Sequence, residues 1–314
     1  MPCNFQTASG FYPWQTTIKK EISTSGIGLH KGDKIDITLK PSEANSGVRF
    51  IRTDLNDELA NRTILANYAN VSDTNMCTTI ENDYGIKIST IEHLMAALSG
   101  SGVDNVDIEI DGSEVPIMDG SSGQFIDLIE NSGLEKLSEK RKFLKIKEHI
   151  EIIDGDKKCS LSPSNNMKFF ASIDFSDKVI GKQEASISLE NFNFKENVSN
   201  ARTFGFMRDV EALRMSGLGL GGSLDNCIII DNNEVINSEG LRFENEFVIH
   251  KLLDAVGDIF TSGYRIQGEY KGYLSGHHLN NLLLKELFDN EDSFELIEVD
   301  DDVHSENQKT LLTA

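Results

Sequence analysis

The stretch Glu244-Asn-Glu-Phe-Val-Ile-His-Lys-Leu-Leu-Asp-Ala-Val-Gly-Asp-Ile259 is the clearest helix in this sequence, and the fold class is worked out from it. Apolar side chains recur along it at roughly helical spacing, at Phe247, Leu252, Val256 and Ile259, although the stripe is not strict. The chain on both sides is rich in short strand patterns. We therefore expect this helix to belong to an α+β structure.

The first half of the chain alternates apolar and polar residues in short runs. This period of two is typical of half-buried strands. It predicts strands at residues 35–39, 48–52 and 106–110, with a turn at 41–47 and a further short strand at 86–89. Helices are expected at residues 90–98 and directly after the loop 112–123.

Residues 135–142 are charged and, apart from Leu137, show no apolar pattern, so we place a domain boundary there. A second strand-rich stretch follows, with β patterns at residues 143–153, 159–161, 169–175, 185–189 and 227–230, a loop at 217–222 and helices at 209–215 and 279–288. Because a strand-rich, helix-containing pattern occurs twice, we expect two α+β domains, residues 1–138 and 143–314. The acidic run 289–306 is expected to be a solvated edge and a frayed tail.

The 314 residues carry 30 Lys plus Arg against 51 Asp plus Glu, a formal net charge of −21. This excess of acid argues against binding to nucleic acid or to anionic lipid. No stretch approaches the ~18 apolar residues of a membrane span, and the first ten residues do not look like a secretory signal. Four scattered cysteines indicate reduced thiols, so we expect a cytoplasmic protein. No feature of the sequence indicates an obligate protein partner.

Two histidines have acidic neighbours at informative spacing. His250 and Asp254 are four residues apart, so on a helix they share a face and can converge on one metal ion. His93 can supply a third ligand, and the adjacent Glu92 then points elsewhere, as a general base would. Two His and one carboxylate form the ligand set of a catalytic zinc site, whereas the HExxH peptidase motif is absent. Each residue taken singly also has a plain structural explanation, such as an ordinary intrahelical pair.

Further candidates surround this set. His277 follows a glycine at the head of a helix, where it can act as general acid or stabilise an oxyanion, with Asp258 as its partner. It can equally be a helix-entry histidine without catalytic duty. The Thr203 hydroxyl can donate to an oxyanion, and Phe204 lies in a stretch of aromatic residues that suits an apolar groove or the core. Cys77 is either an auxiliary ligand or a buried inert thiol.

Six runs, in one order, resemble the UDP-3-O-acyl-N-acetylglucosamine deacetylase family of lipid A biosynthesis. They cover nearly the whole chain and are Gly26-Ile-Gly-Leu-His-Lys-Gly32, Ser89-Thr-Ile-Glu-His-Leu-Met-Ala-Ala-Leu-Ser-Gly100, Glu114-Val-Pro-Ile-Met-Asp-Gly-Ser121, Ala201-Arg-Thr-Phe-Gly-Phe-Met207, His250-Lys-Leu-Leu-Asp-Ala-Val-Gly-Asp258 and Ser275-Gly-His-His-Leu-Asn-Asn281. The resemblance implies two similar domains, each a sheet layered with helices, with the active site between them.

The resemblance also implies a reaction, the zinc-dependent removal of the N-acetyl group from a UDP-linked acylated amino sugar. One zinc would be held by His93, His250 and Asp254, with Glu92 as the base that activates its water. Thr203 would stabilise the oxyanion. His277, held by Asp258, would protonate the leaving amine. Iron(II) could replace zinc, since the ligand set does not select zinc uniquely.

The family further has a hydrophobic passage for the acyl chain, formed by an insert that falls here at about residues 200–225. Phe206, Met207, Val210 and Leu224 match positions of that passage. Phe204 is a further substrate-binding candidate, and Lys251 would meet the UDP part or nearby substrate oxygens. Burial gains ~0.8 kcal/mol per CH₂, so such a passage gives both affinity and length selection. The chain departs from the family at His278, where a small residue is usual, and His277 is favoured as the acting residue because it directly follows Gly276.

Two other functions remain open on the sequence. One is a zinc deacetylase of a different sugar or small amide, against which the passage residues argue. The other is a catalytically silent protein that binds a nucleotide sugar. Loss of Glu92, a metal ligand or His277 would have supported the silent protein, and the sequence retains all of them.

Overall fold

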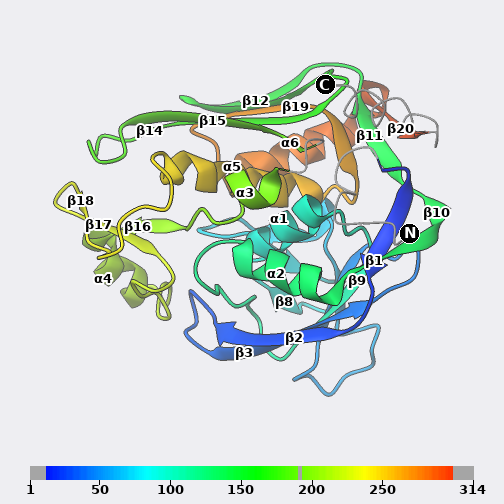
Figure 1. Ribbon diagram of the computed structural model, residues 1–314, viewed down its shortest axis with the longest axis horizontal. Helices are drawn as coiled ribbons and strands as arrows, with labels where there is room; N and C mark the ends of the chain where they lie inside the picture. Colours follow the sequence, from blue (N-terminus) through cyan, green and yellow to red (C-terminus); the bar gives the residue numbers. More distant parts are fainter. Residues whose placement is uncertain (1–11, 190–192, 300–314) are drawn as a thin grey trace, which may run out of the picture.

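The computed structural model describes residues 12–189 and 193–299. The fold is mixed α+β. Figure 1 shows four layers, in which a sheet built from the first half of the chain and a sheet built from the second half enclose two layers of helices. The helices pack mainly against each other through α1 (Glu92–Ser101) and α5 (Glu246–Phe260). The interior between the sheets is therefore formed by residues from both halves.

The sheet of the first half has five strands in the order β2-β3-β9-β4-β5. Their bounds are β2 (Ile22–Ile27), β3 (Lys34–Pro41), β9 (Val106–Ile110), β4 (Val48–Arg52) and β5 (Thr63–Leu65). The three strands predicted at 35–39, 48–52 and 106–110 are confirmed. Strands β3 and β9 bury alternate residues, because one face of this sheet packs on α1 and on α2 (Gly123–Ser132).

A small three-stranded sheet lies next in the chain and leads into α1. Its strands are β6 (Val71–Asp73), β7 (Thr79–Glu81) and β8 (Lys87–Ile88), preceded by the 3₁₀ turn η2 (Tyr68–Asn70). The strand predicted at 86–89 is this short β8. The helix predicted from residue 90 begins at Glu92 instead, because Thr90 has a left-handed backbone (φ 59°) that a helix cannot contain.

The sheet of the second half has seven strands, in the order β12-β13-β19-β11-β20 with β14 and β15 branching from β19. Their bounds are β12 (Ile150–Asp154), β13 (Lys157–Ser162), β19 (Arg265–Tyr273), β11 (Lys142–Ile146), β20 (Phe294–Glu298), β14 (Met167–Asp174) and β15 (Lys182–Ser188). Its inner face is covered by α5 and α6 (His277–Asp289). The short helix α3 (Phe194–Asn197) contacts α1, and the 3₁₀ turn η4 (Glu291–Ser293) contacts α6.

Three segments differ from their sequence patterns. The charged run near the expected boundary forms β10 (Leu134–Lys140), which pairs with β1 (Trp14–Ile18) and places the Lys136 amine 3.5 Å from the centre of the Trp14 ring. The β pattern 143–153 is split into β11 and β12, because the N–H groups of Lys147 and Glu148 donate to Ser293 outside the sheet. Part of the acidic run forms β20, an edge strand, and residues 300–306 lie outside the described residues.

The segment matched to the family's insert, at about residues 200–225, contributes to a separate small unit at one end of the molecule, which continues to residue 235 (Figure 1). It consists of β16 (Phe204–Phe206), α4 (Met207–Met215), β17 (Ile228–Asp231) and β18 (Glu234–Val235). None of the residues of α4 is buried. Within the part of the chain that the structure describes, no helix is long and apolar enough to cross a bilayer.

Candidate metal centre

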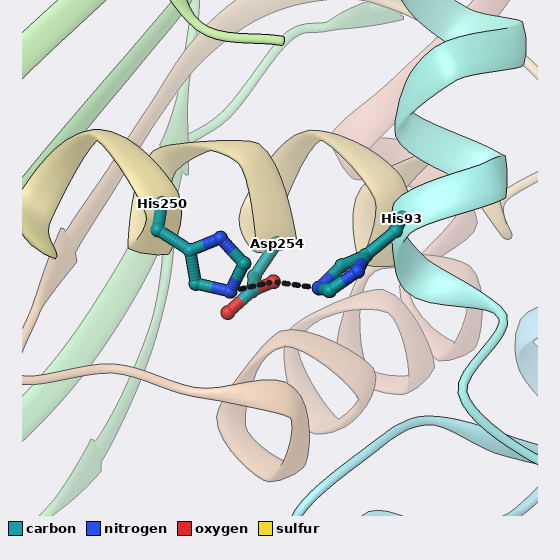
Figure 2. A group of neighbouring side chains, drawn as sticks. All are labelled: His93, His250 and Asp254. Carbon is teal, nitrogen blue, oxygen red and sulfur yellow. Dashed lines mark ion pairs between the residues drawn. The ribbon is translucent and has the colours of Figure 1, made fainter. Parts of the chain in front are cut away.

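Three side chains from the two central helices converge on one point. His93 extends from α1, and His250 and Asp254 extend from adjacent turns of α5 (Figure 2). The Nε2 atoms of His93 and His250 lie 3.5 and 3.4 Å from Oδ1 of Asp254. One donor atom of each residue lies within 4.8 Å of the other two, and all three residues are buried. This spacing suits a single metal ion between them.

Neighbouring groups hold the outer atoms of two of these residues. Nδ1 of His250 donates to the carbonyl oxygen of Ala201 at 3.0 Å, so Nε2 keeps the lone pair that can bind a metal ion. Oδ2 of Asp254 accepts from the Lys251 amine at 2.9 Å, which leaves Oδ1. Among residues 12–189 and 193–299, Oδ1 of Asp254 has no hydrogen-bond partner although it is buried. A buried carboxylate oxygen without a donor is costly unless a cation binds it, so the residues fit a metal ion.

The electrostatics favour the forms that bind metal. Burial lowers the pKa of His250 to about 3, so its imidazole is neutral and keeps a lone pair. Burial by itself would favour the neutral acid of Asp254, but the neighbouring His250 and Lys251 hold the pKa of this carboxyl well below its usual range. The centre therefore presents a neutral imidazole and a carboxylate at neutral pH.

The metal centre opens into a pocket of about 150 Å³. Residues from both halves of the chain line it: Leu29, His30, Met76, Thr90, Glu92, His93, Ile117, Thr203, Phe204, His250, Lys251, Asp254 and His277. Glu92 is buried in its wall, and its Oε2 accepts from the backbone N–H of Thr78 at 3.0 Å. Burial raises the pKa of Glu92, so this carboxylate has a stronger affinity for a proton, as a general base needs.

His277 lies on the same pocket and is paired with a carboxylate. Its Nδ1 lies 2.9 Å from Oδ2 of Asp258. Burial works against the charged ring, but the attraction of Asp258 raises the pKa of His277 to about 9, so the ring is an imidazolium at neutral pH. Asp258 also accepts from the Asn280 amide at 2.8 Å and from the Thr78 hydroxyl at 2.6 Å. The pocket thus holds a carboxylate that can accept a proton and a protonated histidine that can give one.

The residues expected to meet substrate are only partly brought together. Thr203, Phe204 and Lys251 line the metal pocket. Met207 and Val210 instead line an open hollow of about 540 Å³ on α4. Phe206 and Leu224 line neither of these two pockets. Phe206 packs on Phe175 with ring centres 5.9 Å apart and under the Arg208 guanidinium, while Leu224 is 44% exposed.

Several residues that bear on the site had no role assigned from the sequence. His30 lines the pocket, and among the described residues neither of its buried ring nitrogens has a hydrogen-bond partner. Glu114 accepts from the backbone N–H of His30 at 2.7 Å and so fixes that loop. His30, Glu114 and Asn280 all fall inside the recognised runs, which is the signal that could have found them. Cys77 is not one of the three clustered groups, and burial raises the pKa of its thiol to about 12.

Comparison with known proteins agrees with this geometry. Residues 15–289 match the family model described as LpxC: UDP-3-O-acyl N-acetylglycosamine deacetylase. Proteins named UDP-3-O-acyl-N-acetylglucosamine deacetylase from Haemophilus influenzae (strain 86-028NP) and Pasteurella multocida (strain Pm70) are each 46% identical over 290 residues, covering 91% of this chain and 94% of each relative. A third with that name, from Shewanella violacea, is 45% identical over 286 residues, with 90% and 92% covered. The chain therefore belongs to the UDP-3-O-acyl N-acetylglycosamine deacetylase family.

Proposed function

We propose that this chain hydrolyses the N-acetyl group of UDP-3-O-acyl-N-acetylglucosamine, which releases acetate and the free amine in lipid A biosynthesis. The observation that carries the proposal is the convergence of His93, His250 and Asp254 beside a pocket that also contains Glu92 and His277. Metal ligands, a base and an acid are the groups that amide hydrolysis needs. The names of relatives that match nine-tenths of the chain supply the substrate.

The metal that we propose is one Zn²⁺ per chain, bound by His93, His250 and Asp254. Two imidazoles and one carboxylate with an open fourth position form a typical catalytic zinc site, and iron(II) also suits this ligand set. The ion would act as a Lewis acid that lowers the pKa of a water molecule and polarises the amide carbonyl. Lys251 keeps Asp254 ionised and fixes its outer oxygen, so the inner oxygen stays directed at the centre.

The protein groups divide the proton transfers between them. Glu92 takes the proton of the attacking water, since its carboxylate is buried at the pocket and its pKa is raised by that burial. Thr203 donates its hydroxyl to the oxyanion that forms at the carbonyl carbon. His277 is charged at neutral pH, so it stabilises the developing negative charge and then gives its proton to the leaving amine.

The substrate would lie between the metal pocket and the insert. Lys251 and Phe204 line the pocket wall and would contact the sugar or the groups linked to it. The acyl chain would follow the apolar side chains of the insert, Phe206, Met207, Val210 and Leu224. Met207 is 41% exposed and Leu224 is 44% exposed, so covering them with an acyl chain removes apolar surface from water.

Two broader points belong to the same proposal. We propose domains at residues 1–138 and 143–314; the interval between them covers the last residues of β10 and the first of β11. Its cysteines at positions 77, 159 and 227 are buried free thiols, which supports a reducing compartment, and we propose the cytoplasm.

The test is acetate release from UDP-3-O-acyl-N-acetylglucosamine by the purified protein, before and after metal removal and after Zn²⁺ is restored. Release that disappears with the metal and returns with Zn²⁺ is the expected result. The Glu92→Gln variant, loaded with the same metal, is the matched control and should release little acetate. A folded, metal-loaded protein that releases none across several acyl lengths would contradict the proposal and favour another amide or a silent binding protein.

A further inference from the structure

Thr78 touches both halves of the proposed acid–base machinery. It lies in the connection between β6 and β7 and is 3% exposed. Its backbone N–H donates to Oε2 of Glu92 at 3.0 Å, and its hydroxyl donates to Oδ1 of Asp258 at 2.6 Å. Asp258 in turn holds Nδ1 of His277. One buried residue thus lies between the group that would accept a proton and the pair that would give one.

The backbone of Thr78 is itself fixed at the start of α1. Its carbonyl oxygen accepts from the N–H of Ile91, the residue directly before Glu92. The Thr78 N–H occupies one oxygen of the Glu92 carboxylate, so Oε1 is the oxygen left for a water molecule at the pocket. The backbone N–H of Thr78 therefore orients Glu92 of α1, while its hydroxyl binds Asp258 of α5.

The Thr78 hydroxyl has a specific effect on Asp258. His277 and Asn280 both bind Oδ2 of this carboxylate, and Thr78 is the donor to Oδ1. Asp258 is 4% exposed, so without that hydroxyl Oδ1 would be buried with no other donor among the described residues. The carboxylate could then turn to share its two oxygens between the remaining donors. An O–H donor to a carboxylate is among the stronger hydrogen bonds in proteins.

We infer that Thr78 is a positioning residue for this reaction, which aims Glu92 through its backbone N–H and holds Asp258 toward His277 through its hydroxyl. The inference rests on the proposed function of the site. It assigns Thr78 no contact with substrate, so its removal should affect turnover and leave substrate binding nearly unchanged.

The experiment compares Thr78→Val, which deletes only the hydroxyl donor, with Thr78→Ser, which keeps it. Thr79→Val is the matched control, because the Thr79 hydroxyl contacts only the Cys77 sulfur, at 3.8 Å, among the side-chain bonds of the described residues. Each zinc-loaded protein is assayed for kcat and KM on UDP-3-O-acyl-N-acetylglucosamine and for the pH dependence of kcat/KM. Metal content and melting temperature show that the site has formed.

For Thr78→Val we expect kcat to fall by about 10- to 100-fold, the range for loss of one hydrogen bond to a charged group, with KM within about twofold. The alkaline limb of the pH profile should move to higher pH. Without the hydroxyl donor the Asp258 carboxylate is less neutralised, so it attracts the His277 proton more strongly and raises the pKa of His277. The other charged or titratable groups around His277 are Glu92 of α1, Asp254 of α5 and His30, and none of them is changed. Thr78→Ser and Thr79→Val should behave like the parent protein.

Three outcomes would overturn the inference: Thr78→Val with parental kcat and pH profile, a loss carried by KM alone, or a serine variant as poor as valine. If the valine variant does not fold, Thr78→Ala makes the same comparison. A double variant with Asp258→Asn adds a further check, since Thr78→Val should cost little once Asp258 is neutral. A parent protein that releases no acetate would contradict the proposed function itself, which is a different result.

Discussion

Gly257 of α5 lies directly against the backbone carbonyl of Glu92 in α1. A Cβ added at Gly257 would overlap that carbonyl oxygen and come within 3.1 Å of the backbone nitrogen of Ala96. The two helices can approach this closely because position 257 has no side chain. His93 follows Glu92, and Asp254 lies one turn before Gly257, so this contact sets the distance across which the metal ligands meet.

The first prediction concerns that contact. Gly257→Ala should push α1 away from α5 and separate His93 from Asp254 by enough to weaken metal binding. The expected result is at least a tenfold weaker zinc affinity with a lowered melting temperature, measured by competition with a chelator and by thermal unfolding. Gly276→Ala is the control, because an added Cβ there meets nothing within 4 Å. Equal zinc affinity in both variants would show that α1 can move away from α5 without disturbing the metal ligands, which would contradict this prediction.

The second prediction tests Asp254 as a ligand. Asp254→Ala removes the carboxylate oxygen that is buried without a hydrogen-bond donor in the described structure, and it also removes the partner of Lys251. The purified variant should contain much less than one zinc per chain by elemental analysis, while Asp83→Ala, an exposed turn residue, should keep its metal. One tightly held zinc in the Asp254 variant would show that Asp254 is not a required metal ligand.

The third prediction separates metal binding from proton transfer at Glu92. Glu92→Gln keeps the shape of the side chain and its acceptor for the Thr78 N–H, but it cannot take up a proton. The variant should hold zinc and release acetate about 10²- to 10⁴-fold more slowly. Its melting temperature should not fall, because the change replaces a buried charge with a neutral amide. Unchanged turnover would remove Glu92 from the role of base.

How far the sequence predicts the site depends on how local each contact is. His250 and Asp254 lie on one helix four residues apart, so their convergence follows from helix geometry alone. The bond from Thr78 to Asp258 joins residues 180 positions apart, and no local pattern indicates it. His93 was a candidate third ligand from the sequence, and the resemblance to a family strengthened it. Neither line of reasoning assigned a role to Thr78 and Asn280, which donate hydrogen bonds to Asp258.

The strands show the same limit. The patterns at 35–39 and 106–110 alternate cleanly and were predicted, whereas β19, which pairs with three other strands, was missed. Its glycines at 268 and 272 and its charged residues resemble a turn. In the structure, a Cβ added at Gly268 would lie 2.6 Å from Cγ1 of Ile146. This glycine therefore permits close packing within a sheet, and the sequence does not distinguish that purpose from a bend.

The fourth prediction concerns the ion pair behind His250. Arg202 and Glu246 have side chains 2% and 0% exposed, and Nε of Arg202 lies 2.9 Å from Oε1 of Glu246. Ala201, the residue before Arg202, orients His250 through its carbonyl oxygen. Arg202→Met would leave the Glu246 carboxylate buried without its cation and should lower the free energy of unfolding by about 3–5 kcal/mol. Denaturant unfolding checks this. Lys195→Met, whose side chain is 44% exposed in its ion pair with Asp127, should change stability by less than about 1 kcal/mol.

The final prediction follows from the charge on His277. Its pKa is raised to about 9 from an ordinary 6.5, so the ring is protonated at pH 7 and loses its proton as the pH rises through about 9. If the protonated ring is the acid, kcat/KM should be constant near neutrality and fall above about pH 9. Asp258→Asn removes the attraction that opposes burial, so the pKa of His277 should drop and the alkaline limb should move toward or below neutral pH.

The same pKa shift affects stability. Between about pH 6.5 and 9 the folded protein binds this proton and the unfolded chain does not, so the stabilisation from the Asp258–His277 pair is complete below pH 6.5 and disappears as the pH passes 9. The parent protein should therefore lose stability over that window more steeply than His277→Gln, which has no titrating ring. Parallel profiles of melting temperature against pH for the two proteins would show that His277 is not held in its charged form, and its role as acid at neutral pH would fall with that result.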